Sequence, residues 1–233
     1  MYKDLKEKFA FTLGATHVEN CHNDRRIAFT LAEVLITLGI IGIVSALTIP
    51  TLIKKFNAIQ TASKLQQAHS LLNNAYKLSV IDNGIYEQWK IGRNAEVYIN
   101  TYFLPYFKNA KICTNYQECG YDSKTPFKGT NNAAMGAFVA RNDLRLPLTL
   151  PNGTYLIIAV GSGNSDNTAI IKSTAVFIDL NGGKKPNRLC EDLFVYQVNN
   201  KGIKPYDSCT PLIMKNGWKI PKNYSTKFNI ESF

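Results

Sequence analysis

Residues 29–49 read FTLAEVLITLGIIGIVSALTI, and this stretch decides the fold of the chain. It holds 21 residues and one charged side chain, Glu33. A helix of about 20 such residues spans the hydrocarbon core of a bilayer. A carboxylate at mid-bilayer costs roughly 3 kcal/mol or more, and although Glu33 lies near the start of the run, it still calls for a partner. The stretch is therefore predicted to be a transmembrane helix with a functional acid.

The residues around this stretch carry a second pattern. The basic segment Asp24–Ala28 ends in a small residue, and Phe29 follows it directly. Counted from Phe29, Glu33 is the fifth residue and Pro50 the twenty-second. This arrangement resembles the N-terminal processing and methylation segment of type IV pilins and type II secretion pseudopilins.

The resemblance implies how the N-terminus is processed. A prepilin peptidase on the cytoplasmic side of the inner membrane would remove residues 1–28 and methylate the new amine of Phe29. The bond between Ala28 and Phe29 is thus the expected processing site. The family usually has Gly before the cut, and here that residue is Ala28. Because Ala is also small, cleavage is expected to survive at a lower rate.

Cleavage before Phe29 would create a cationic amine four residues from Glu33. The two groups could pair within one helix. Between two staggered helices, the amine of one chain would neutralise Glu33 of the next in a low-dielectric setting, where Coulomb terms are large. The acid would then act as an assembly signal. The alternative is an ordinary signal anchor that tolerates its Glu.

Small residues and a proline also mark the apolar run. Gly39, Gly42 and Ala46 fall on one helical face, where small side chains permit close helix contacts. Pro50 removes one backbone hydrogen bond and is expected to bend the helix without ending it. The residues predicted to serve assembly are therefore Phe29, Glu33, Gly39, Gly42 and Pro50.

Composition and charge bound the rest of the protein. The chain has 233 residues, of which 45% are apolar and 11% aromatic, so a moderate domain can bury a core beside one anchor. Without residues 1–28 it keeps 22 basic and 13 acidic side chains, a net charge of about +9. The charges are dispersed, and no nucleic-acid motif is present, so a nucleic-acid partner is not expected.

The orientation in the membrane does not follow from charge alone. Arg25 and Arg26 precede the apolar run, while Lys54 and Lys55 follow it, so the positive-inside rule is nearly balanced. The cysteines and the family resemblance place the N-terminus in the cytoplasm. The expected location is the inner membrane, crossed once, with a periplasmic or extracellular head.

The chain beyond Pro50 is polar but keeps a helical period. One helix of about 50 residues is expected from Phe29 to Ile81, before the stop signal Asp82-Asn83-Gly84. Its second half is amphipathic and should pack on a sheet. The predicted apolar stripe is Leu65, Ala68, Leu72, Ala75 and Ser79, widened by Leu71 and Leu78.

The remainder reads as an α+β head. An aromatic-rich segment, residues 85–108, is expected to be core and to hold a short helix over 95–104. Alternating apolar residues predict antiparallel strands at Ala137–Arg141, Thr154–Val160, Ala175–Leu180 and Leu193–Val198. The fold class is thus α+β and pilin-like, with a long N-terminal helix on a small antiparallel sheet. The expected divisions are a leader 1–28, a membrane half 29–49, an amphipathic half 50–82 and a head 83–233.

Four cysteines remain after residue 28, and an even number in a periplasmic domain suggests disulfides. Three pairings are open, and the local one is favoured, Cys113–Cys119 with Cys190–Cys209. In the chain-entropy model the two loops would contribute roughly 2 and 3 kcal/mol.

Chemistry-bearing motifs are otherwise lacking. The sequence contains no Gly-x-Ser-x-Gly nucleophile motif and no phosphate-binding loop, so no enzyme is expected. It also contains no Cys-x-x-Cys pair of the kind that binds zinc, and no cofactor or metal is expected. The stretch from Asp179 to Cys190 fits an EF-hand loop poorly, because Lys184 stands where the loop needs Gly and Cys190 where it needs Glu. A plain turn is expected there.

Taken together, these features predict a structural subunit of a type IV pilus-like or type II secretion filament. Its expected partners are the prepilin peptidase, other pilin or pseudopilin subunits and the inner-membrane assembly platform. Whether it serves secretion, a surface pilus or competence stays open. The alternative is a single-pass, membrane-anchored extracytoplasmic binding domain that does not polymerise.

Overall fold

The computed structural model describes residues 30–90, 95–135, 144–161 and 174–229. The chain divides into two compact units, residues 1–46 and 47–233. One helix, α1 (Leu31–Asn83), belongs to both, with Pro50 inside it. It ends at Asn83, and the next residue, Gly84, has a φ of 80°, a left-handed conformation that favours glycine. The predicted long helix is therefore confirmed, shifted by two residues.

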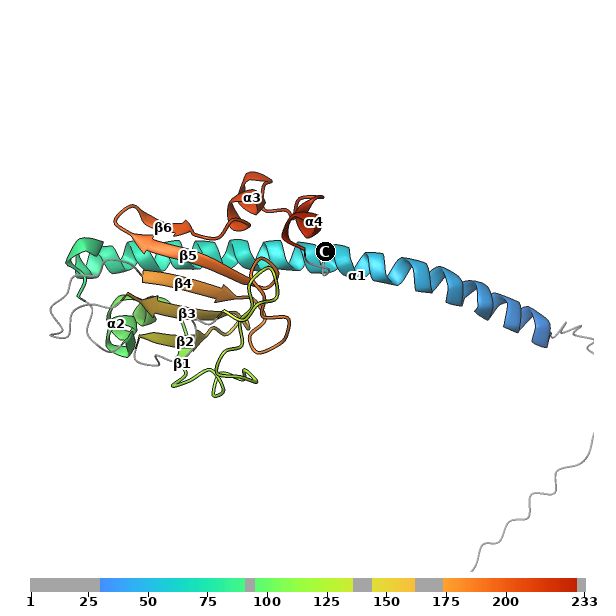
Figure 1. Cartoon of the computed structure of the whole chain (residues 1–233), viewed down its shortest axis with the longest axis horizontal. Coiled ribbons are helices and arrows are strands. Elements are labelled where there is room, and N and C mark those ends of the chain that lie inside the picture. The colour runs from blue at the N-terminus through green and yellow to red at the C-terminus, as the bar shows by residue number, and fades with distance from the viewer. Residues whose placement is uncertain (1–29, 91–94, 136–143, 162–173, 230–233) are drawn as a thin grey trace, which may run out of the picture. The chain divides into compact units, whose positions relative to one another are not determined.

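The second unit contains one antiparallel sheet in which every strand pairs with its neighbours in sequence, in the order β1 to β6 (Figure 1). The strands are β1 (Lys111–Ile112), β2 (Arg145–Thr149), β3 (Tyr155–Val160), β4 (Thr174–Asp179), β5 (Leu193–Asn199) and β6 (Gly202–Pro205). The short helices are α2 (Ala95–Tyr102), α3 (Thr210–Lys215) and α4 (Tyr224–Phe228), with 3-10 turns η1 (Tyr86–Gln88) and η2 (Leu104–Tyr106). The α+β class is thus confirmed.

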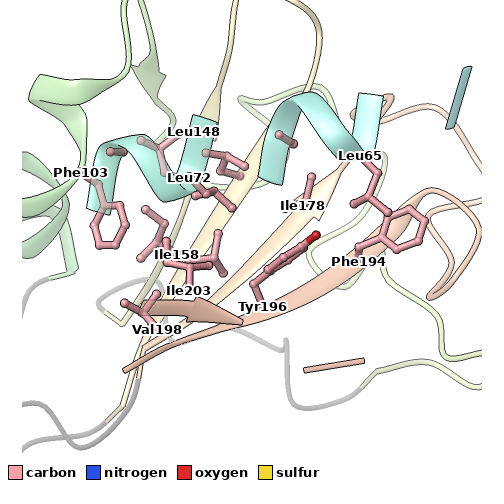
Figure 2. Close-up of a cluster of buried hydrophobic side chains, with 14 of the residues drawn as sticks. Leu65, Leu72, Phe103, Leu148, Ile158, Ile178, Phe194, Tyr196, Val198 and Ile203 are labelled. Carbon is pink, nitrogen blue, oxygen red and sulfur yellow. The ribbon is translucent and has the colours of Figure 1, made fainter. Parts of the chain in front are cut away.

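The amphipathic half of α1 packs on one face of this sheet. Its buried residues repeat at helical spacing: Ala62, Leu65, Ala68, Leu72, Ala75 and Ser79. Figure 2 shows Leu65 and Leu72 above inward-facing residues of the strands, among them Ile158, Ile178 and Phe194. One member of the predicted stripe is wrong, since Leu78 is 48% exposed. Leu71, the other residue expected to widen the stripe, is partly buried against the core.

The opposite face of the sheet is covered as well. Because successive strand residues face opposite sides, Ile157 points away from Leu156 and Ile158. It is buried in a second cluster, which consists of Cys113, Tyr116, Cys119, Tyr121, Phe127, Ile157 and Leu193. The loops between β1 and residue 135 therefore act as a second layer, which the sequence did not predict.

The aromatic residues that follow α1 are core, as their composition suggested. Trp89 is fully buried, and its indole N–H donates to the carbonyl of Gly84 at 2.9 Å. Its ring stacks on Tyr102 with a centroid distance of 4.6 Å. The hydroxyl of Tyr98 lies 3.0 Å from that of Thr174, at the start of β4. These contacts fasten the α2 region to the sheet.

Three of the four predicted strands correspond to β3, β4 and β5, while Ala137–Arg141 lies outside the described residues. The strand β2 was missed because Arg145 and Pro147 interrupt its apolar run. Pro147 lacks an N–H, yet its carbonyl accepts a hydrogen bond from the Cys113 N–H at 2.9 Å. Both β1 and β6 are too short to show an alternating pattern.

Two disulfides staple the second unit, and they are the pairings that local spacing favoured. Cys113 bonds to Cys119, and Cys190 to Cys209. The first closes a loop in the covering layer. The second ties Cys190, three residues before β5, to the segment between β6 and α3. The Tyr224 hydroxyl adds a hydrogen bond to the Cys190 carbonyl at 2.7 Å, which brings α4 to the same place.

The packing of α1 on the sheet leads to a stability prediction. Leu72→Ala should lower the free energy of unfolding by about 2–5 kcal/mol, because it leaves a cavity where the side chain is fully buried. Chemical denaturation of the detergent-solubilised chain measures this. Leu78→Ala is the matched control and should cost about 1 kcal/mol or less. Equal losses for the two variants would contradict the packing of α1.

Candidate functional site

The first turn of α1 is closed by a capping box. Thr30 precedes the helix, and its hydroxyl accepts a hydrogen bond from the Glu33 N–H at 3.2 Å. In return Glu33 Oε2 accepts from the Thr30 N–H at 2.8 Å and from the Thr30 hydroxyl at 2.9 Å. This reciprocal pairing satisfies backbone donors that have no partner inside the helix.

The capping box gives Glu33 a partner within its own helix. The pattern Thr30-x-x-Glu33 by itself indicates a helix start, whereas the partner expected for Glu33 was an amine. The carboxylate also lies at the positive end of the helix dipole, which favours a negative charge. Glu33 therefore has a local structural role, whatever it does between chains.

The first half of α1, which follows this capping box, carries apolar side chains on all sides. Its most apolar 18-residue window has a mean hydropathy of 2.2, and no part of that window is buried within the protein. By length and composition this half of α1 is able to cross a membrane. Leu31 and Leu47 are 80% and 74% exposed. In water such residues would leave a large apolar surface in contact with solvent.

The predicted assembly residues in α1 are open to an external partner. A side-chain carbon added at Gly39 or Gly42 would meet no atom within 4 Å. The fold of a single chain therefore gives no steric reason for glycine at these two positions. Pro50 lies inside the helix, as expected. The processing residues Ala28 and Phe29 lie outside the described residues.

A second polar cluster lies where β4 ends and β5 begins. Asp179 Oδ1 accepts the N–H groups of Asn181 and Gly182 at 3.0 and 2.9 Å, and its Oδ2 accepts the Tyr121 hydroxyl at 2.8 Å. Asp192 likewise accepts the N–H groups of Asn187 and Arg188 at 2.9 and 2.7 Å.

These hydrogen bonds define the role of the cluster. Each oxygen of the two carboxylates accepts at least one protein hydrogen bond, so they shape the turn between the strands. Among the described residues no group of three His, Cys, Asp or Glu side chains could hold a metal ion.

Burial sets the titration of this cluster. It raises the pKa of Asp179 to about 7, and the nearby negative charge of Asp192 adds to the effect. Burial also raises the pKa of Asp192 to about 6, against the backbone N–H groups of Arg188 and Asn187. The folded protein therefore binds protons here more tightly than the unfolded chain does.

This difference predicts a pH dependence of stability. Because the folded pKa values lie above the unfolded ones, the free energy of unfolding should fall as pH rises from about 4 to about 7. Asp179→Asn should make this decrease with pH smaller, because the Asn side chain has nearly the same shape as Asp but does not titrate. Asp122→Asn, at an exposed carboxylate, is the control and should leave the profile unchanged. Denaturant titrations at several pH values measure the effect, and an unchanged slope in Asp179→Asn would contradict it.

Comparison with known proteins adds no family to this picture. No family model, no curated protein and no solved structure matches the chain. The features that bear on function are those of the chain itself. They are the exposed apolar half of α1, the Thr30–Glu33 capping box and the disulfide-bonded α+β unit.

Proposed function

We propose that this chain is a structural subunit of a type IV pilus-like or type II secretion filament. The observation that carries the proposal is α1: its first half exposes apolar side chains all round, while its second half buries one stripe under a sheet. A helix of this kind suits a protein that is first anchored in a membrane and later packs the apolar half of the helix against other copies. The α+β unit would be displayed outside as a pilin-like head.

Processing would prepare the helix for this role. A prepilin peptidase would cut between Ala28 and Phe29 and methylate the new amine. The subunit would then be held in the inner membrane by residues 29–49, with its head on the periplasmic or extracellular side. The assembly platform and other subunits would extract it into the filament.

Pairing of the Phe29 amine of one subunit with the Glu33 carboxylate of the next has to be compatible with the capping box. Both hydrogen bonds from Thr30 end on Oε2 of Glu33, so the carboxylate keeps capacity for a further donor. The amine of a neighbouring subunit would provide that donor and a charge. Gly39 and Gly42, which no described residue crowds, would let the neighbouring helix come close.

One observation favours the alternative, a membrane-anchored extracytoplasmic binding domain that does not polymerise. The capping box already satisfies the carboxylate within one chain, so Glu33 does not require a second helix. In that case the apolar half of α1 is only an anchor. The two functions differ in what the charge of Glu33 must do.

The variant Glu33→Gln separates the two roles. Gln still completes a capping box but carries no charge. The filament function therefore predicts normal membrane insertion with loss of subunit cross-linking and of sheared filaments, measured by membrane fractionation and immunoblotting. Glu87→Gln, at an exposed acid of η1, is the control and should assemble normally. Normal assembly of Glu33→Gln would leave the anchored domain as the better reading.

The N-terminus of the membrane-extracted protein is a second test. Intact mass and N-terminal sequencing should show a start at Phe29 and one added methyl group. Ala28→Gly should accelerate processing, because it restores the residue that the resembling family usually has. A protein that begins at Met1 in cells that process other prepilins would contradict the proposal.

A further inference from the structure

A groove of about 530 Å³ lies between α1 and the segment that follows α3. On the α1 side it is lined by residues at helical spacing, among them Lys55, Ile59 and Ala62. On the other side it is lined by residues 218–220. The lining of α1 extends from residue 55 to residue 66, over which a helix rises about 16 Å. The groove therefore follows about three turns of α1, and it lies wholly within the compact unit of residues 47–233.

Apolar side chains in and beside this groove are exposed. Ile59 is 70% exposed, and Phe56, one turn earlier on α1, is 62% exposed. Trp218 is partly buried, with the centroid of its ring 5.2 Å from that of His69. The backbone of Trp218 has a φ of 57°, a left-handed conformation that is uncommon for a bulky side chain. The groove thus presents an apolar surface that the described part of the chain leaves open.

Lysines border this apolar surface. Lys55 and Lys219 line the groove itself. Three more exposed lysines lie within four residues of these two in the sequence: Lys54, Lys215 and Lys222. Residues 51–81 and 210–229, which supply the whole lining, contain no acidic residue. The elements that form the groove therefore carry positive charge and no acid to compensate for it.

We propose that this groove binds an acidic amphipathic helix of another protein. In this mode of recognition a helix lays its apolar stripe into a groove through side chains at positions i, i+3, i+4 and i+7. The groove follows enough of α1 to accept a stripe of that length. Acidic side chains beside the stripe then face Lys55 and Lys219. The inference goes beyond the proposed function and depends neither on filament assembly nor on the membrane anchor.

Other occupants match only part of this surface. Among the described helices of the chain, α1 has one acid at each end, Glu33 and Asp82, α2 has only Glu96, and α3 and α4 have none. These helices of a second copy therefore do not provide an acidic amphipathic face. A nucleic acid pairs with the lysines, but its charged backbone offers little to Ile59 and Phe56. An acidic amphipathic helix matches the charge and the apolar surface together.

The test uses the full chain in nanodiscs of phosphatidylcholine, a lipid without net charge. The probe is a fluorescein-labelled model helix of about 14 residues, with Leu at positions i, i+3, i+4 and i+7 and Glu on both flanks. Two matched peptides carry Lys in place of Glu, or the same residues in scrambled order. Fluorescence anisotropy, with empty nanodiscs as the background, should show that the acidic helix binds at least about tenfold more tightly than either matched peptide.

Charge reversal in the protein tests the lysines. Lys55→Glu with Lys219→Glu should weaken binding of the acidic helix about tenfold, because each change turns an attraction into a repulsion. Lys201→Glu with Lys204→Glu makes the same charge change at exposed positions outside the groove lining and should leave binding unchanged. Equal losses in the two double variants would reduce the effect to net charge and overturn the proposal.

The apolar contribution has its own matched pair. Ile59→Ser should weaken binding of the acidic helix about fivefold, because it removes an apolar side chain from the groove. Ile81→Ser changes a similarly exposed isoleucine of α1 that does not line the groove, and binding should stay the same. Carbodiimide coupling should join carboxylates of the bound peptide to Lys55 or Lys219, as identified by peptide mass mapping.

The remaining outcomes each contradict the proposal. Equal binding of the acidic and basic helices would leave only a nonspecific apolar contact, and equal binding of the scrambled peptide would leave only charge attraction. Couplings confined to lysines outside the groove would place the peptide elsewhere. Coupling of Lys55 or Lys219 to a second copy, undiminished by the acidic helix, would assign the groove to that copy. Tighter binding of a duplex DNA than of the acidic helix would assign it to nucleic acid.

Discussion

The structure depends on one helix that meets two different environments along its length. A helix makes its backbone hydrogen bonds within its own segment, except at its ends and at a proline such as Pro50, and this permits residues 31–49 to be surrounded by lipid. In the second half of α1, only one narrow stripe of side chains is buried. The stripe from Ala62 to Ser79 is buried against the sheet, with Leu65 and Leu72 as its largest side chains. The rest of the second unit is built on this contact.

The two ends of α1 are fixed by different chemistry, and each end can be explained from a few residues. The Thr30–Glu33 capping box begins the helix, and Gly84 ends it in a left-handed conformation. The indole of Trp89 then bonds back to the Gly84 carbonyl, so the exit of the helix is tied to the aromatic core. The direction in which the chain leaves α1 thus follows from contacts made by its next few residues.

Much of this arrangement could be predicted from the sequence, because strong local patterns carry it. The apolar run, the helical stripe, three strands and the local disulfide pairing all follow from periodicity and spacing. What escaped prediction depends on tertiary contacts: β2 keeps its place despite Pro147 because β1 and β3 hold it on both sides. The second covering layer has no periodic signal, since its apolar residues lie in loops. The capping role of Glu33 follows from the local pattern Thr30-x-x-Glu33, which was not among the features predicted from the sequence.

The two edges of the sheet have a consequence for how copies of this protein meet. An exposed sheet edge offers unpaired backbone groups to any neighbouring chain, and crowding in a membrane or a filament would make such pairing dangerous. Here β1 has only two residues, and β6 has four and ends at Pro205. Within the part of the chain that the structure describes, neither edge is long enough to template a foreign strand. Two short edges of this kind discourage edge-to-edge pairing between copies of the chain.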